Sequence, residues 1–290
     1  MDYRIRTIGP DEYPAGLLEI PNIPPTLSVL GAPLEKDAAY LAVVGSRAHT
    51  SYGADVCERL IRGLAGSDII IVSGLALGID SVAHRAAMAA GLKTVALPGS
   101  GLSERSIYPA TNLSLAKEIL ASGGSLVSEF PNDAKARNYF FPKRNRLMAG
   151  IARAVLVIEA ADKSGTLITA HLAMDYNRDV LAVPGPITSA LSLGANLLIK
   201  QGATPITRSE DILEVFGLKQ AALFDEHAEA VRSLSPEERE IYEMLTEPIP
   251  RDSILAGGDL PAHTVNSLLT AMELKGLIKE EYGEVRRVWN

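Results

Sequence analysis

The chain has 290 residues, of which 47 % are apolar and 22 % charged, with a formal net charge of −7 at pH 7. This composition is typical of a globular protein with one or two domains, and the acidic total argues against wholesale coating of nucleic acid but not against one local basic groove. The single cysteine, Cys57, excludes an intramolecular disulfide and a zinc finger. We see no signal peptide and no apolar run near the roughly 18 residues of a membrane span, so we expect a soluble, cytoplasmic protein.

Short apolar runs alternate with helical patterns through most of the chain. A proline-rich stretch, 13–31, comes first and is expected to pack as an irregular lead-in. The apolar runs resemble buried parallel strands and cover 41–46, 69–74, 94–99, 125–131, 154–160 and 180–185. The helical segments cover 52–65, 79–90, 111–122, 143–151 and 165–177. The alternation predicts an α/β fold whose parallel sheet carries helices on both faces and binds ligands at the carboxyl ends of its strands.

The pattern changes after residues 193–217, so we predict a first domain over 1–218 and a linker or bridging helix over 219–232. Residues 233–290 show the order helix, short helix, helix and hairpin of a winged-helix domain. Ser235 is predicted to cap its first helix, with Pro236 at the first helical position and Glu238 at the third.

One candidate phosphate site lies directly after a predicted strand. Lys163, Ser164, Gly165 and Thr166 stand at a helix start, where free N–H groups and the helix dipole favour an anion. Gly165 would let a phosphate approach the backbone closely. The alternative is an ordinary capped helix, because Ser and Thr are common at this position.

Three further small-residue turns follow predicted strands. The first holds Gly45, Ser46 and Arg47, the second holds Gly74 with Asp80 as a cap, and the third covers 97–109. Each alone has the alternative of a plain strand-to-helix turn. Four such turns on one sheet edge indicate a site more strongly than any one of them.

A basic and aromatic segment stands out against the acidic total. From 134 to 158 there is no carboxylate, whereas the window holds Lys135, Arg137, Lys143, Arg144, Arg146 and Arg153 beside three consecutive aromatics, Tyr139, Phe140 and Phe141. A positive groove with aromatics for base stacking is how proteins hold single-stranded nucleic acid. The alternative is that the aromatics are core, and we expect this of Tyr139 or Phe140.

Signals for other chemistry are weak. The five histidines never fall at metal-ligand spacing, and neither a Walker A loop nor a G-x-S-x-G elbow occurs. Ser73, Asp80 and His84 form a conceivable triad, but Asp80 and His84 are better explained as residues at a helix start. We therefore predict no catalytic residue, no metal and no cofactor.

Several motifs in order resemble the DNA-processing protein A (DprA, or Smf) family: "VVGSRAHTSYG", "IVSGLALGIDSVAH", "VALPGSGLSERSIYP", "FPKRNRLMAGIARAVLVIEAADKSGTLITAHLAM" and "GANLLIKQGA". The resemblance covers roughly 13–217. It implies an extended Rossmann-like domain that binds single-stranded DNA, protects incoming DNA in natural transformation, helps load the RecA recombinase and forms a homodimer. Many members carry a C-terminal winged helix. Members often carry a helix-hairpin-helix-like domain at the N-terminus, and we do not expect one in the short stretch before residue 13.

With this resemblance, Phe141 is our choice for base stacking, Arg47, Lys143, Arg144 and Arg146 are the charge contacts, and Asn145 is a polar contact. Residues 164–166 are expected to hold a phosphate. The full set predicted to bind DNA is Gly45, Ser46, Arg47, Gly74, Phe141, Lys143, Arg144, Asn145, Arg146, Lys163, Ser164, Gly165 and Thr166. The apolar segment 189–206 is the expected dimer contact.

Two other classes of function stay open at this stage. A Rossmann-like nucleotide-binding or phosphoribohydrolase-type enzyme has a comparable sheet edge, and Glu159 would supply its carboxylate, although the PGGxGT signature is absent. A protein-binding scaffold acting through the winged helix is the third possibility.

Residues 233–290 carry six Lys and Arg against eleven Asp and Glu, a net of −5, so we predict that this domain contacts protein and does not read DNA.

Overall fold

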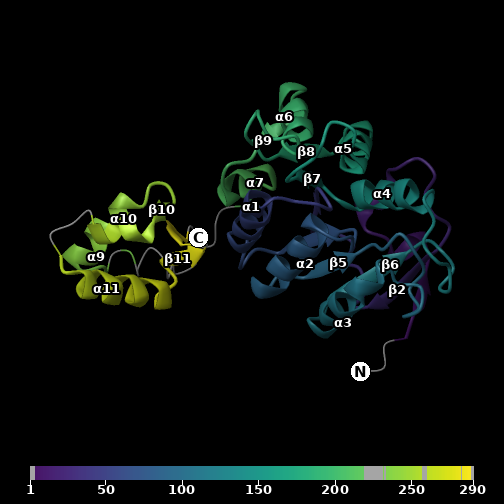
Figure 1. The fold of residues 1–290 in the computed structure, drawn as a ribbon. Helices are drawn as coiled ribbons and strands as arrows, with labels where there is room; N and C mark the ends of the chain where they lie inside the picture. The colour runs from purple at the N-terminus through teal and green to yellow at the C-terminus, as the bar shows by residue number, and fades with distance from the viewer. Residues whose placement is uncertain (1–3, 219–230, 232, 257–259, 282, 289–290) are drawn as a thin grey trace. The chain divides into compact units, whose positions relative to one another are not determined.

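A computed structural model describes residues 4–218, 231, 233–256, 260–281 and 283–288 (Figure 1). The chain divides into two compact units, Met1–Ala221 and Ala222–Asn290, each with a hydrophobic core of its own. The predicted linker, 219–232, falls almost wholly outside the described residues and stays a prediction. No helix among the described residues is long and apolar enough to cross a membrane.

The first unit is built on a sheet whose nine described strands follow the order β1-β2-β6-β5-β4-β3-β7-β8-β9. The strands are β1 (Arg6–Ile8), β2 (Leu27–Gly31), β3 (Ala39–Val44), β4 (Ile69–Ser73), β5 (Thr94–Ala96), β6 (Ser125–Ser128), β7 (Ala154–Val157), β8 (Asp179–Ala182) and β9 (Thr204–Pro205). From β6 to β9 every neighbouring pair is parallel. The predicted α/β fold with an extended Rossmann-like parallel sheet is confirmed.

The lead-in differs from its prediction. Residues 13–31 were expected to be irregular, yet β2 pairs antiparallel with β6, and β1 pairs antiparallel with β2. The prolines fall before β2, around a short 3-10 turn, η2 (Ala15–Leu18), and they leave Leu27–Gly31 able to join the ladder. Leu27 and Val29 alternate into the core from this strand.

Helices cover both faces of the sheet. One face carries α1 (Ser51–Arg62), α2 (Ile79–Ala89), α3 (Leu113–Ala121) and α7 (Ser209–Val215), and the other carries η2, α4 (Phe140–Ile151), α5 (Gly165–Asp175) and α6 (Leu193–Lys200). Two further 3-10 turns are η1 (Pro10–Glu12) and η3 (Ala110–Asn112). The apolar runs are continuous because each strand is buried on both sides: Leu41 and Val43 face α1 and α2, whereas Ala42 and Val44 face the other layer.

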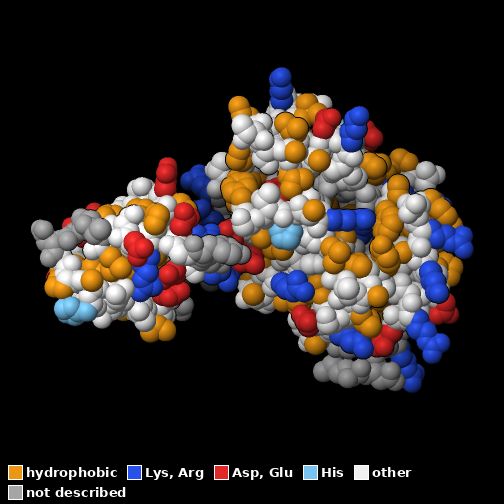
Figure 2. Space-filling view, in the orientation of Figure 1, with side chains coloured by type: hydrophobic (Ala, Val, Ile, Leu, Met, Phe, Trp, Pro, Cys, Tyr) orange, Lys and Arg blue, Asp and Glu red, His pale blue; other side chains and the backbone are white. Residues whose placement is uncertain are grey.

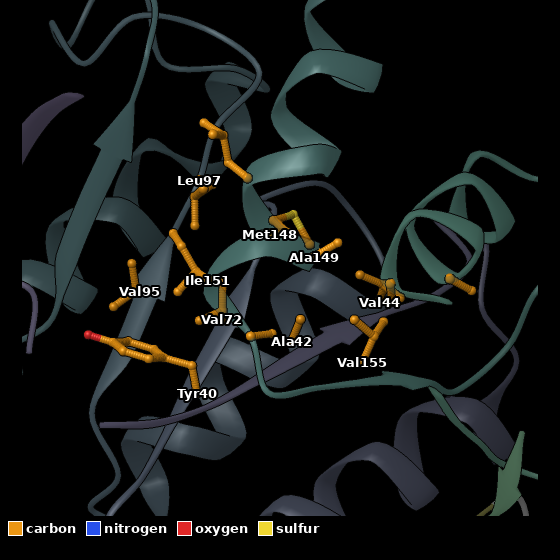
Figure 3. Close-up of a cluster of buried hydrophobic side chains, with 14 of the residues drawn as sticks. Tyr40, Ala42, Val44, Val72, Val95, Leu97, Met148, Ala149, Ile151 and Val155 are labelled. Atoms are coloured by element: carbon orange, nitrogen blue, oxygen red, sulfur yellow. The ribbon is translucent and has the colours of Figure 1, made fainter. Parts of the chain in front are cut away.

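Helix α4 packs on the sheet through its second half. Figure 3 shows Met148, Ala149 and Ile151 of α4 near Ala42 and Val155, which come from neighbouring strands. This packing leaves the first half of α4, from Phe140 to Asn145, at the carboxyl edge of the strands. The basic residues predicted for a groove are therefore brought to the edge where Rossmann-like sheets bind ligands.

The second unit is a winged helix. It contains α9 (Pro236–Met244), β10 (Ile249–Pro250), α10 (Arg251–Ala256), α11 (Ala262–Leu274), β11 (Ile278–Glu281) and β12 (Glu284–Arg287). The predicted helix start is confirmed, because the Ser235 hydroxyl accepts a 3.1 Å bond from the Glu238 N–H and the Glu238 carboxylate accepts a 2.9 Å bond from the Ser235 N–H.

Candidate nucleic-acid interface

The topology of the sheet marks where a ligand is expected. From β3 the chain moves outward through β4, β5 and β6, and then β7 returns to the other side of β3 and leads outward through β8 to β9. The strand order therefore reverses between β3 and β7. Doubly wound sheets bind ligands in the crevice at the carboxyl ends of the strands at this point.

A cleft of about 570 Å³ opens at that position. Its walls come from the turn after β3, the turn after β7 and the first half of α4. Figure 2 shows Lys and Arg side chains beside hydrophobic ones over the region of α4 and α5. Nine of the thirteen residues predicted to bind DNA line the cleft: Gly45, Ser46, Arg47, Phe141, Arg144, Asn145, Ser164, Gly165 and Thr166.

The turn after β7 has the geometry of a capped helix start that is open to the cleft. The Ser164 hydroxyl accepts a 3.0 Å hydrogen bond from the Thr166 N–H, and the Thr166 hydroxyl donates to the Gly45 carbonyl at 3.1 Å. The two bonds occupy the N–H and the hydroxyl of Thr166, which belongs to the segment 164–166 expected to hold a phosphate. Apart from the adjacent residues and the backbone of its own helix, no heavy atom lies within 4 Å of the place where a Cβ on Gly165 would stand, so the backbone there is open to a ligand.

Arg47 and Phe141 form a cation–π pair at the cleft. The Arg47 guanidinium carbon lies 5.1 Å from the centre of the Phe141 ring, and Arg47 is exposed. The edge of the ring rests on Gly99, where a Cβ would come within 2.6 Å of two ring carbons. Phe141 is thus held in place by packing while remaining partly exposed.

Arg144 differs from the role predicted for it as a surface charge. Its side chain is buried, and one guanidinium nitrogen donates to the carbonyls of Gly74 and Leu97, at the ends of β4 and β5. A side chain on Gly74 would collide with this guanidinium, which explains the glycine. Arg144 therefore positions the edge of the sheet, because its Nε and one of its terminal nitrogens already have partners inside the protein.

Asn145 extends this connection toward the phosphate turn. Its amide oxygen accepts a 3.0 Å bond from the Nε of Arg144, and its amide nitrogen reaches the Gly165 carbonyl at 3.4 Å. Arg144 and Asn145 together link the ends of β4 and β5 to the start of α5.

The remaining predicted cations do not join this cleft. Lys143 and Arg146 do not line it, and α4 turns them away from the side that carries Phe141, Arg144 and Asn145. Arg146 forms an ion pair with Glu129 and donates to the Asn22 carbonyl at 3.0 Å. Lys163 also lies outside the cleft, and Gly74 lines a smaller depression beside it. This cleft therefore does not include Lys143, Arg146 or Lys163, and their contact with DNA stays a prediction.

Of the other aromatics in the segment, Phe140 is buried and stacked on Phe130 with ring centres 3.8 Å apart, whereas Tyr139 is exposed. Sequence reasoning missed Asn138 and Thr169, which also line the cleft. The helical period predicts Thr169, one turn after Thr166 on α5, whereas Asn138 lies in the turn before α4, where no periodic pattern marks it.

A buried acid and a buried histidine, both on α2, complete the surroundings. Burial raises the pKa of Asp80, against the opposing effect of Arg144, and the Asp80 carboxylate accepts a 3.3 Å bond from the Ala76 N–H. Burial also lowers the pKa of His84 to about 3, and its Nδ1 lies 2.7 Å from the Thr94 hydroxyl. Ser73 donates to the Val43 carbonyl and also interacts with the Asp80 carboxylate, whereas His84 contacts Thr94 and has no hydrogen bond to either residue in the part of the chain that the structure describes, so the three do not form the relay of a triad.

Glu159, the carboxylate of the alternative enzyme, does not line the cleft. It is buried, and its two oxygens accept bonds from the N–H and the hydroxyl of Thr50 at 2.9 and 2.6 Å. It therefore stabilises the start of α1.

The fold and the cleft define a class of protein with an extended Rossmann-like sheet, a basic and aromatic site at its switch point and a winged-helix unit. The family model described as DNA recombination-mediator protein A matches residues 4–217, and the model of the DprA winged helix domain matches residues 225–284. The chain belongs to this family, as the sequence motifs indicated.

Curated relatives and solved structures agree with the family. Protein Smf of Escherichia coli is 40 % identical over 276 residues, which cover 92 % of this chain and 72 % of that protein. The structure of DNA processing protein A from Streptococcus pneumoniae aligns with a TM-score of 0.67 and 39 % identity over 73 % of this chain and 74 % of that one. The protein from Helicobacter pylori, solved for its single-stranded DNA binding mode, aligns with a TM-score of 0.66 and 28 % identity over 74 % of this chain and 96 % of that one.

Proposed function

We propose that this protein binds single-stranded DNA in the cleft between the turn after β3, the turn after β7 and α4. The observation that carries the proposal is the exposed Arg47 guanidinium over the Phe141 ring, in the same cleft as the open helix start at Gly165. Cations and helix N–H groups hold phosphates, and an aromatic face stacks on any base. The single-stranded DNA binding mode described for the Helicobacter pylori relative supports the proposal.

Titration separates this proposal from a nucleotide-binding enzyme. Labelled single strands, blunt duplexes of the same sequence and mononucleotides are compared by fluorescence anisotropy. Single strands are expected to bind more tightly than duplex and with little dependence on sequence, because stacking and backbone charge do not read base edges. If about four phosphates are neutralised, the slope of log K against log salt is about −3. Equal affinity for duplex and single strand would overturn the proposal.

We also propose that the protein is a cytoplasmic homodimer that helps to load RecA recombinase onto single strands in natural transformation, and that it carries out no bond chemistry of its own. The family description as a recombination mediator supports this role. The test is RecA filament formation on strands already covered by a single-strand binding protein. The full chain is expected to shorten the lag, and an unchanged lag would contradict loading.

The dimer contact is proposed for segment 189–206. Leu193 and Leu197 lie one turn apart on α6 and are 46 % and 38 % exposed, which is the pattern of an unpartnered helix face. A twofold contact would join two clefts and raise avidity on long strands. Sedimentation of the double variant Leu193→Glu/Leu197→Glu is expected to give monomers, and a wild-type chain that is monomeric at micromolar concentration would refute the dimer.

A further inference from the structure

A second apolar surface lies next to the cleft. Tyr108, in the loop between β5 and η3, is 46 % exposed, and Leu77, in the turn between β4 and α2, is 48 % exposed. The two loops are far apart in sequence, yet both side chains line one shallow depression. Large apolar side chains exposed together on neighbouring loops mark an interaction surface more often than single ones do.

The depression continues the cleft. Arg47, Ala76, Phe141 and Arg144 line both of them. The Tyr108 ring centre lies 5.9 Å from the Phe141 ring centre, with the planes tilted by 50°. Tyr108 is thus the aromatic ring that lies next to Phe141 along the joined hollows.

The charges of the depression suit the same ligand. Arg47 lies at the boundary of the two hollows, over the Phe141 ring, and the described lining of the depression contains no carboxylate. A positive charge between two aromatic side chains matches a phosphate between two bases. An apolar peptide would make no use of the guanidinium, so charge complementarity favours nucleic acid.

We propose that Tyr108, supported by Leu77, is a second base-stacking platform that extends the single-stranded DNA path beyond the cleft. This inference rests on the proposed function. On this proposal the protein holds a strand longer than the cleft alone accommodates. The strand leaves the cleft over the loops after β4 and β5.

The test compares short and long oligonucleotides, of ~4 and ~12 nucleotides, on wild type, Tyr108→Ala and Tyr108→Phe. Tyr108→Ala is expected to lower affinity for the long strand about tenfold and to change affinity for the short strand less than about twofold. Tyr108→Phe keeps the ring and is expected to bind both strands as wild type does. Tyr52→Ala is the control, because Tyr52 is similarly exposed and lines neither hollow.

The outcomes separate this inference from the proposed function. Wild type that fails to bind either strand would refute the proposed function itself. Normal wild-type binding with Tyr108→Ala unchanged on the long strand, or weakened equally on both, would overturn only the second platform. Photocrosslinking with a long strand that carries 5-iodouracil is expected to modify the peptide containing Tyr108, and crosslinks confined to other peptides would count against the platform.

Discussion

The cleft and the winged helix are two places where a DNA-binding protein of this architecture would be expected to hold DNA, and they differ in what their cations do. In the cleft, Arg47 is exposed and lies over an aromatic ring. In the winged helix, Arg251 pairs with Glu280, and Lys275 pairs with Glu238 at 2.6 Å. The Arg287 guanidinium also lies over a ring, 4.4 Å from the centre of Tyr242, but its Nε already donates to the Tyr242 carbonyl at 2.6 Å.

The fold alone does not decide which unit binds nucleic acid. A cation that already has a carboxylate partner offers little to a phosphate, because binding must first break the existing pair. The winged helix also carries the net charge of −5, and its helix α11 presents Glu273 and Leu274 to solvent. By fold, the winged helix would be the first choice for the unit that binds DNA. By charge, the Rossmann-like unit is the better candidate.

The largest effect is expected from reversing one charge in each unit. Arg47→Glu should lower single-strand affinity about 100-fold, or about 2.7 kcal/mol, because a charge-assisted contact becomes a repulsion. Arg287→Glu makes the same charge change in the winged helix and should alter affinity less than about threefold. Anisotropy titrations at one salt concentration compare the two variants. Similar losses of affinity in the two variants would show that the two units do not differ in how their cations act on DNA.

Phe141→Ala tests the aromatic part of the cleft. Loss of one stacked base is expected to weaken binding by about 1–3 kcal/mol. Phe140→Ala is the matched control on the same helix, since Phe140 is buried against Phe130 and its loss should lower the melting temperature while folded protein still binds. If Phe141→Ala instead gives the large loss of stability and Phe140→Ala the loss of binding, the two rings have been assigned the wrong way round.

Arg144→Lys separates a positioning residue from a phosphate contact. Lysine keeps the charge but not the planar fork that joins the Gly74 and Leu97 carbonyls and Asn145, so affinity should fall about tenfold together with some stability. The slope of log K against log salt should not change, because no phosphate contact is lost. Arg47→Ala, measured beside it, should reduce the slope by about 0.7. A reduced slope for Arg144→Lys would return this residue to the DNA surface.

The sequence predicted those parts of the fold that depend on local pattern. The runs at 69–74 and 154–160 became β4 and β7, and the helix start at Ser235 formed as its capping pattern indicated. The strand Leu27–Gly31 was missed because prolines precede it and because its partner, β6, lies about 100 residues further along the chain. Pairing between such distant segments depends on the folded sheet and leaves little trace in a local window.

The site was predicted in composition but not in orientation. A run such as Lys143, Arg144 and Arg146 shows that positive charge is present, but it does not show which side chains the helix turns inward. The helix start within the aromatic run decides this, and the prediction placed it at 143, whereas α4 begins at Phe140. The burial of Arg144 also requires carbonyls from β4 and β5, which come from segments distant in sequence.

Gly165→Ala is expected to produce a smaller effect. The added methyl group meets no atom within 4 Å beyond the adjacent residues and its own helix backbone, and alanine favours a helix over glycine by up to about 1 kcal/mol, so the melting temperature should stay the same or rise. Affinity should fall about fivefold, because the methyl group keeps a phosphate from approaching the backbone. Unchanged affinity would show that no ligand approaches the start of α5. It would also count against the cleft as the place where DNA binds.

The smallest effect is expected from removing the winged helix. A chain that ends near Lys219 keeps the whole cleft, and it loses a unit whose net charge of −5 repels DNA at long range. Single-strand affinity should therefore change by less than about threefold, and it should rise slightly at low salt, where repulsion over a distance is screened least. The measurement is a titration of both chains at two salt concentrations, with sedimentation and thermal melting to confirm that the shortened chain is folded and has the oligomeric state of the full one. The opposite outcome is a loss of affinity of more than about tenfold, or about 1.4 kcal/mol, in a shortened chain that is folded and has an unchanged oligomeric state. Such a loss would mean that the wing arginines, Arg286 and Arg287, leave their present contacts to hold DNA. The winged helix would then be the unit that binds DNA.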